Sequence, residues 1–115
     1  DIEIYGDGSQ TRTFCYINDN IEACLNAFEQ NLVVNDVVNI GGNKEITIKN
    51  LAEIIIQKTN SKSKIVRVPP LKDGDMHRRC PDNTYMKEQL LKRELIPLEE
   101  GIQKLLHVGL FDNTK

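Results

Sequence analysis

Apolar and polar positions along this chain fall into two patterns, short alternating runs and longer stretches with helical spacing. The short runs are rich in β-branched and aromatic residues, which are typical of strands. They predict strands at residues 2–5, 11–17, 36–40 and 64–68. The turn residues Gly6-Asp7-Gly8-Ser9 lie between the first two runs and predict a β-hairpin.

Helical spacing first appears after Asn18 and Asp19, either of which can cap a helix. This helix is expected to end near Asn31. Its apolar stripe, which is expected to be buried, consists of Ile21, Cys24, Leu25 and Phe28. Thr47 is the expected N-cap of a second helix that stops at Asn60-Ser61. Its apolar stripe is Ile48, Leu51, Ala52 and Ile55.

Two further helices are predicted after a polar loop over residues 72–79. Asp82 can cap a short helix that buries Met86, Leu90 and Leu91. Pro97 fits the first position of the last helix, whose first turn holds Glu99 and Glu100. Its expected buried face is Leu98, Ile102, Leu105 and Leu106. The order β-β-α-β-α-β-loop-α-α predicts an α/β fold with a small mixed sheet.

The bulk composition indicates a globular protein with one domain over residues 1–115. Hydrophobic residues make up 39% of the chain and charged residues 28%, and the longest apolar runs are far too short to span a bilayer. The start lacks the basic and apolar regions of an export signal, so a cytoplasmic location is expected. A formal charge of -2 argues against binding to DNA or RNA.

The cysteines and histidines suggest neither a disulfide framework nor a metal site. Cys15, Cys24 and Cys80 are odd in number and widely spaced, as expected of reduced packing residues. His77 and His107 have no ligand-like spacing to them or to each other. The common serine hydrolase motif G-x-S-x-G does not occur in the sequence.

Two features could contact phosphate. The glycines of Gly6-Asp7-Gly8-Ser9 suggest a dinucleotide loop, but a third glycine and an immediately following helix are missing. Arg12 and the Arg78-Arg79 pair could bind a diphosphate, since guanidinium groups are natural partners of phosphate. From spacing alone, solvated surface arginines are the favoured explanation.

Five ordered motifs resemble the C-terminal portion of extended short-chain dehydrogenase/reductases that act on nucleotide sugars, the NAD-dependent epimerase/dehydratase family. Residues 5–19 resemble Y-G-D-G-x-Q-x-R-x-F-x-Y-V-x-D, and residues 38–41 resemble the end of a Y-N-I-G strand. Residues 47–52 resemble T-x-x-E-L-A, with Asn50 in place of the glutamate, residues 79–82 resemble R-x-P-D, and residues 97–102 match P-L-x-E-G-I. The residues of these motifs are most similar to those of UDP-glucuronate decarboxylases, with UDP-glucose 4-epimerases and dTDP-glucose 4,6-dehydratases as near relatives.

The resemblance implies a substrate site and a cofactor. Arg12 and Arg79 are expected to bind the diphosphate of a UDP- or dTDP-sugar and Tyr5 to lie beside the nucleobase, while Gln10 is a further candidate for a contact in the same pocket. In such enzymes NAD oxidises the sugar at C4 before decarboxylation, elimination or inversion. NAD and the N-terminal half that binds it are thus the expected partners, and the parent enzyme is expected to be a homodimer.

The catalytic pair of the family does not occur in this sequence. It requires Tyr and Lys in Y-x-x-x-K spacing, which places both on one helical face. Tyr5, Tyr16 and Tyr85 are instead followed, four residues later, by Ser9, Asn20 and Gln89. No catalytic residue is therefore predicted, and the chain is expected to be inactive by itself. The alternative is a non-catalytic interaction module or an inactive fragment, whose apolar helix faces are left uncovered.

Overall fold

The computed structural model describes residues 1–108 and shows an α/β fold that divides into two compact units. The first unit contains Asp1–Arg12, Ile46–Arg79 and the described residues from Glu99 onward. The second contains Thr13–Glu45 and Cys80–Leu98. The single sugar-nucleotide-binding domain expected over residues 1–115 stays a prediction, and its last seven residues lie outside the described ones.

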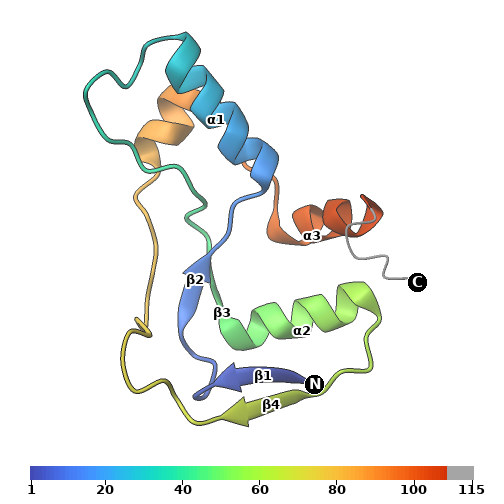
Figure 1. Cartoon of the computed structure of the whole chain (residues 1–115). Helices are drawn as coiled ribbons and strands as arrows, with labels where there is room; N and C mark the ends of the chain where they lie inside the picture. The colour runs from blue at the N-terminus through green and yellow to red at the C-terminus, as the bar shows by residue number, and fades with distance from the viewer. Residues whose placement is uncertain (109–115) are drawn as a thin grey trace. The chain divides into compact units, whose positions relative to one another are not determined.

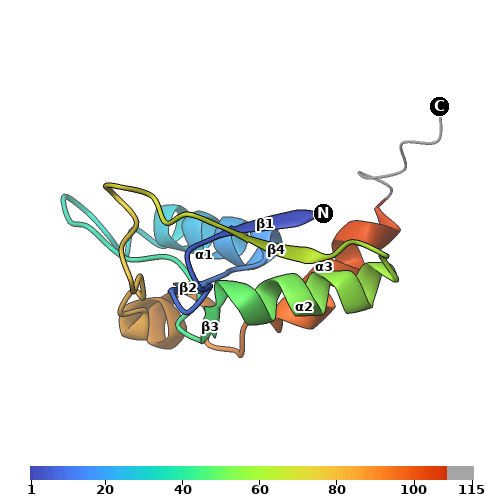
Figure 2. The same cartoon turned by 90° about the horizontal axis from the view of Figure 1, so that it is seen from below.

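The first unit is built on a parallel strand pair covered by a helix. Strand β1, Ile2–Tyr5, pairs with β4, Ile65–Val68, in a register that joins Ile2 to Ile65 and Tyr5 to Val68. Helix α2, Ile48–Thr59, runs beside this pair (Figures 1 and 2). Ile4 and Ala52 are the buried apolar side chains of this layer. The strands predicted at residues 2–5 and 64–68 and the helix predicted after Thr47 are thus confirmed.

The ends of α2 are also as predicted. The hydroxyl of Thr47 accepts a hydrogen bond from the backbone N–H of Asn50 at 3.1 Å, which satisfies one free donor of the first turn. Asn60 ends the helix in the left-handed conformation, with φ of 50°. Asparagine tolerates this conformation because its short polar side chain can bond locally.

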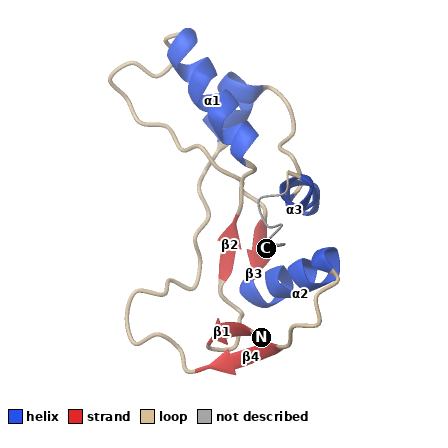
Figure 3. Ribbon diagram, turned by 45° about the vertical axis from the view of Figure 1, so that its right-hand side comes forward, coloured by secondary structure: helices blue, strands red, loops and turns tan. Residues whose placement is uncertain are grey.

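The predicted hairpin between the first two strands is wrong. Strand β2, Thr11–Thr13, pairs with β3, Glu45–Thr47, whereas β1 pairs with β4 (Figure 3). Gly6 and Gly8 have φ of 72° and 78°, and the turn between them redirects the chain from one sheet to the other. Strand β3 was not predicted, because three residues are too few for an alternating pattern to be recognised.

The second unit packs helix α1, Ile17–Glu29, against a short π-helix, η1, Met86–Leu91. Its core consists of Ala23, Met86, Leu90 and Leu91. The π character is visible in the hydrogen bond from the N–H of Lys92 to the carbonyl of Lys87, five residues earlier. The predicted cap at Asp82 is wrong for η1, whose N-cap is Tyr85 without a side-chain bond; the carboxylate of Asp82 instead accepts from the N–H of Thr84 at 3.0 Å, in the turn before the helix.

The buried face of α1 is not the predicted one. Ile21, Leu25 and Phe28 are 48%, 51% and 83% exposed, and Cys24 is exposed as well. The residues that face the core are instead Asp19, Ala23, Asn26 and Ala27. The cause is polar: Asp19 is buried by an ion pair, and the amide of Asn26 donates to the carbonyl of Leu90 at 2.6 Å. These bonds set the orientation of the helix.

Two boundaries of the second unit also differ from expectation. Helix α1 begins at Ile17 after Tyr16, which makes no side-chain capping bond, so the expected caps Asn18 and Asp19 lie inside the first turn. The strand expected over residues 11–17 is correspondingly shorter.

Residues 36–40 form no strand. Val38 and Ile40 pack against the core of the second unit, while Val37 is 90% exposed. A strand requires a hydrogen-bonded neighbour, and no described strand pairs with this segment.

The last helix, α3, covers Leu98–His107 with Glu99 and Glu100 in its first turn, as predicted. It begins one residue after Pro97 rather than at it. The four apolar residues of its predicted face are half-buried, and Gly101 is buried. Among residues 1–108, no helix combines the length and the apolar character needed to cross a membrane.

Candidate functional site

The turn after β1 is held in one shape by its own polar groups and by the start of α2. The carboxylate of Asp7 accepts from the N–H and the hydroxyl of Ser9 at 2.9 and 2.6 Å, and these bonds lower the pKa of Asp7. The carbonyl of Gly8 accepts from the N–H of Lys49 at 3.1 Å. A Cβ on Gly8 would lie 3.0 Å from the Cβ of Lys49, so glycine is needed there for packing as well as for its positive φ.

Gln10 connects this turn to the polar loop of residues 72–79. Its carbonyl accepts from the N–H of Ile48 at 3.0 Å, which fixes its backbone. Its side-chain amide donates to the carbonyl of Tyr5 at 3.1 Å and to the carboxylate of Asp75 at 3.2 Å. Tyr5 as a whole remains about half exposed. Two of the predicted site residues, Tyr5 and Gln10, are therefore in direct contact.

Arg12 is held by the same loop. Its Nη2 lies 2.5 Å from the carboxylate of Asp75, and both side chains are largely covered, with exposures of 20% and 26%. Its Nη1 donates to the carbonyls of Thr11 and Met76 at 2.7 and 2.8 Å. A guanidinium has five N–H donors, and these bonds use three of them. The other two can bind an anion.

Arg79 reaches the site through its backbone. The N–H of Thr11 donates to the carbonyl of His77 at 2.8 Å, and the N–H of Arg79 donates to the carbonyl of Thr11 at 3.4 Å. Thr11 and Arg78 form a parallel bridge between these two bonds. Arg79 thus lies next to the strand that carries Arg12, with its side chain exposed. That both guanidinium groups converge on one diphosphate stays a prediction.

The residue that sequence reasoning missed is Asp75. Its two carboxylate oxygens contact Arg12 and Gln10 separately, so it joins two predicted site residues. The sequence marks residues 72–79 as a polar loop, but the acidic residues of this loop are indistinguishable by spacing. Only the folded loop shows that Asp75 faces the strand.

The described residues do not fit an NAD site. The glycine turn leads into β2, and no helix follows it directly. The first N–H groups of α2, from Ile48, Lys49 and Asn50, are already taken by the carbonyls of Gln10 and Gly8 and the hydroxyl of Thr47. A dinucleotide site needs such N–H groups free for the pyrophosphate. These residues therefore supply no binding loop for the pyrophosphate of NAD.

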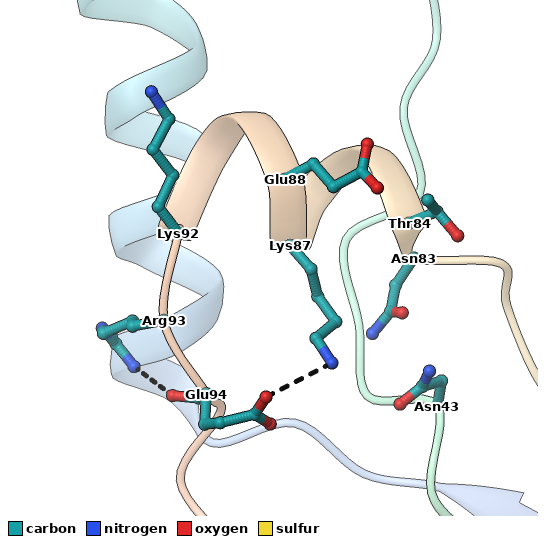
Figure 4. Close-up of a pocket in the computed structure, with 8 residues that line it drawn as sticks. All are labelled: Asn43, Asn83, Thr84, Lys87, Glu88, Lys92, Arg93 and Glu94. Carbon is teal, nitrogen blue, oxygen red and sulfur yellow. Dashed lines mark hydrogen bonds and ion pairs between the residues drawn. The ribbon is translucent and has the colours of Figure 1, made fainter.

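A separate cavity of about 650 Å³ lies in the second unit, and none of the predicted site residues lines it (Figure 4). Its lining residues are Asn43, Asn83, Thr84, Lys87, Glu88, Lys92, Arg93 and Glu94. The ammonium of Lys87 lies 3.6 Å from the carboxylate of Glu94, whose backbone carbonyl accepts from Arg93 at 3.0 Å. The basic groups are largely matched by acidic ones within the same unit.

Arg93, which lines this cavity, is already held in ion pairs within the protein. It pairs with Glu22 at 2.5 Å and with Asp19 at 2.8 Å, and the hydrogen bonds that it donates to these carboxylates raise the pKa of the guanidinium. Among the described residues, no three His, Cys, Asp or Glu side chains gather as a metal site would require. The contacts of Asp75 with Arg12 and Gln10, and of Gln10 with Tyr5, are therefore the stronger candidate site.

Comparison with known proteins identifies relatives of this chain. The sequence pattern of the NAD dependent epimerase/dehydratase family matches residues 1–41. The UDP-N-acetyl-alpha-D-glucosaminuronate decarboxylase of Bacillus cytotoxicus is 36% identical over 111 residues, which are 92% of this chain and 34% of that protein. The UDP-glucuronic acid decarboxylase 1 of Danio rerio is 35% identical over 105 residues, which are 91% of this chain and 24% of that protein.

A solved structure shows the same relationship in three dimensions. The crystal structure of the UDP-glucose 4-epimerase of Thermotoga maritima with UDP-glucose superposes with a TM-score of 0.78 at 33% identity. The superposition covers 90% of this chain and 32% of that one. This chain spans between 24% and 34% of the length of the three relatives. The chain is thus similar to members of the NAD-dependent epimerase/dehydratase family, and its α/β fold corresponds to part of the Rossmann-type enzymes of that family.

Proposed function

We propose that this chain binds the diphosphate of a UDP- or dTDP-sugar, as the substrate-binding part of an NAD-dependent decarboxylase, epimerase or dehydratase. Arg12 and Arg79 bind the diphosphate. Tyr5 lies beside the nucleobase, and Gln10 makes a lesser contact in the same site. UDP-linked substrates or ligands occur in the names of all three relatives, which supports a nucleotide sugar as the ligand class.

The observation that carries this proposal is the state of Arg12. The guanidinium is four-fifths covered and fixed by three hydrogen bonds, and two N–H donors are left over. A covered and immobilised arginine binds phosphate better than a freely moving one, because less side-chain entropy is lost. The backbone N–H of Arg79 donates directly to the carbonyl of Thr11, in the same strand as Arg12.

Calorimetric titration of UDP and UDP-glucuronate into the chain tests this proposal. Arg12→Ala and Arg79→Ala should each weaken binding, because each removes charge-assisted hydrogen bonds of about 1.5–3 kcal/mol. This corresponds to a loss of roughly tenfold to a hundredfold in affinity. Arg67→Ala on β4 is the matched control, since Arg67 is an exposed arginine of the same unit and the charge change is the same.

The outcomes separate clearly. Equal affinity of the wild type and the Arg12→Ala, Arg79→Ala double variant would refute the diphosphate site. Equal losses in all three single variants would mean that net charge alone controls binding. Circular dichroism of each variant shows that the fold is retained.

The parent activity requires groups that these residues do not supply. We infer that NAD and the catalytic Tyr–Lys pair come from an N-terminal NAD-binding half. The three cysteines are free in the structure, which is consistent with a cytoplasmic location. On this proposal the chain binds the substrate, and the N-terminal half supplies the groups that carry out the reaction.

A second candidate function, an interaction module, is favoured by the exposed face of α1. Ile17, Ile21, Leu25 and Phe28 follow one another at helical spacing, and each is between 48% and 83% exposed. A continuous apolar stripe on a helix usually marks an interface. We infer that this face binds the NAD-binding half.

The partner test needs a polypeptide that contains the NAD-binding part of a relative such as the Bacillus cytotoxicus decarboxylase. Size-exclusion chromatography should show a complex with the wild-type chain, and Leu25→Glu, Phe28→Glu should abolish it. Gln57→Glu on the exposed surface of α2 is the control for added negative charge. A complex that survives the double substitution would exclude α1 as the docking face.

A further inference from the structure

The polar loop before Arg79 brings one acidic residue into the proposed diphosphate site. Asp75 directs one carboxylate oxygen to Arg12 at 2.5 Å and the other to Gln10 at 3.2 Å. Gln10 in turn donates to the carbonyl of Tyr5. A single carboxylate therefore joins side chains from the turn and from β2.

We propose that Asp75 is a positioning residue, which holds Arg12 and Gln10 in the geometry that receives a nucleoside diphosphate. This inference rests on the proposed function, and it adds a residue that the sequence motifs did not include. Asp75 itself makes no contact with the nucleotide. It acts by restricting two side chains that otherwise have many rotamers.

The contrary possibility is that Asp75 competes with the phosphate for Arg12. Two observations argue against it. Arg12 has two N–H donors beyond the three that it uses in the structure, so a phosphate can bind without displacing the carboxylate. Both oxygens of Asp75 are also engaged, which means that displacement would break two bonds at once.

The backbone around Asp75 also opposes its release. The carbonyl of Met76 accepts from Arg12 at 2.8 Å, and the carbonyl of His77 accepts from the N–H of Thr11 at the same distance. Two residues later, the N–H of Arg79 donates to Thr11. The residues directly after Asp75 are thus fastened along β2, which keeps the carboxylate beside Arg12.

The test compares Asp75→Ala, Asp75→Asn and Asp73→Asn in UDP titrations. Asp75→Ala should weaken UDP binding about tenfold, because two loosened side chains must be ordered on binding. Asp75→Asn keeps an oxygen that can accept from Arg12, so it should recover part of the loss. Asp73→Asn is the control, since it removes the same charge from an exposed position two residues away.

A second measurement does not depend on nucleotide. The Nε–H signal of Arg12 in NMR, assigned with Arg12→Lys, should be sharp and dispersed in the wild type and in Asp73→Asn. It should broaden or collapse in Asp75→Ala. A merely destabilised fold would instead shift signals throughout the first unit.

The results separate the two proposals. If the wild type binds UDP and Asp75→Ala binds as tightly or more tightly, the positioning role is refuted while the diphosphate site stands. An unchanged Arg12 signal in Asp75→Ala refutes it as well. If the wild type does not bind UDP, the proposed function fails, and an Arg12 signal that still depends on Asp75 supports the contact alone.

Discussion

Asp19 and Arg93 form an ion pair in which the carboxylate is completely buried and the guanidinium reaches solvent. Their Oδ1 and Nη1 atoms lie 2.8 Å apart, and the exposures of the two side chains are 0% and 37%. The other oxygen of Asp19 accepts from the N–H of Ile96 at 2.8 Å. One carboxylate thus connects the first turn of α1 with the chain that follows η1.

This arrangement predicts that Asp19→Ala strongly destabilises the chain. The substitution leaves the Ile96 N–H without its acceptor and removes the buried member of the pair, so the free energy of unfolding should fall by about 3 kcal/mol. Glu22→Ala, which removes the exposed partner of the same arginine, should cost less than about 1 kcal/mol. Urea denaturation followed by circular dichroism measures both. Equal losses would show that burial of Asp19 is unimportant.

The same pair explains why the sequence misplaced the buried face of α1. Hydrophobic spacing placed Ile21, Leu25 and Phe28 inside, because periodicity assumes that a single core decides the orientation of a helix. In the structure, Asp19 and Asn26 determine it through bonds to residues more than 60 positions away. Polar partners so distant leave no local signature in a sequence.

Elements with local signals were predicted well. Thr47 and Asn60 mark the ends of α2 because capping depends on residues within one turn. The strands β1 and β4 were predicted by composition, but their pairing was not, since pairing is a long-range choice. The expected strand over residues 36–40 lacks any described neighbour with which to pair.

In the candidate site, too, residues with a local sequence signal were predicted and a residue placed by long-range contacts was not. Tyr5, Gln10, Arg12 and Arg79 were named from motifs, and the structure brings the first three into one set of contacts with the backbone of the fourth nearby. Asp75 could not be named, because its role depends on how the loop folds back on β2. Their roles in binding remain predictions for the titrations described above.

The turn at Asp82 predicts a specific pH dependence. The hydroxyl and the N–H of Thr84 donate to the carboxylate, and both bonds lower the pKa of Asp82 from its ordinary 3.8. Because the bonds favour the charged form, their stabilising contribution is complete above the ordinary pKa and is lost as pH falls below about 4. An NMR titration of the side-chain carboxyl carbon should show a midpoint below 3.8.

The Thr84→Val variant is the control for this titration. It removes the hydroxyl donor, which is the largest cause of the lowered pKa, and keeps the backbone N–H. The midpoint of Asp82 should therefore move up toward the ordinary value. A midpoint that does not change would mean that Thr84 has no effect on the carboxyl group.

Adjacent glycines at residues 41 and 42 offer a matched test of packing. A Cβ on Gly42 would lie 2.1 Å from the carbonyl oxygen of Phe14, whereas one on Gly41 would be in ordinary contact with Pro81 at 3.4 Å. Gly42→Ala must therefore move backbone and should cost about 3 kcal/mol or more. Gly41→Ala should change the unfolding free energy by less than about 1 kcal/mol. Urea titrations of the two variants compare them, and similar values would contradict the close approach at Gly42.

Two substitutions on α1 distinguish the observed orientation of this helix from the one that its apolar spacing predicts. Phe28 is 83% exposed and Ala23 is 0% exposed. Phe28→Ser should therefore change the free energy of unfolding by no more than about 0.5 kcal/mol, as surface substitutions do. Ala23→Leu should cost about 1–3 kcal/mol, because the added atoms must displace Met86 and Leu90 in the core. If the helix were turned as the sequence predicts, the order of the two effects would be reversed, and chemical denaturation of both variants decides between them.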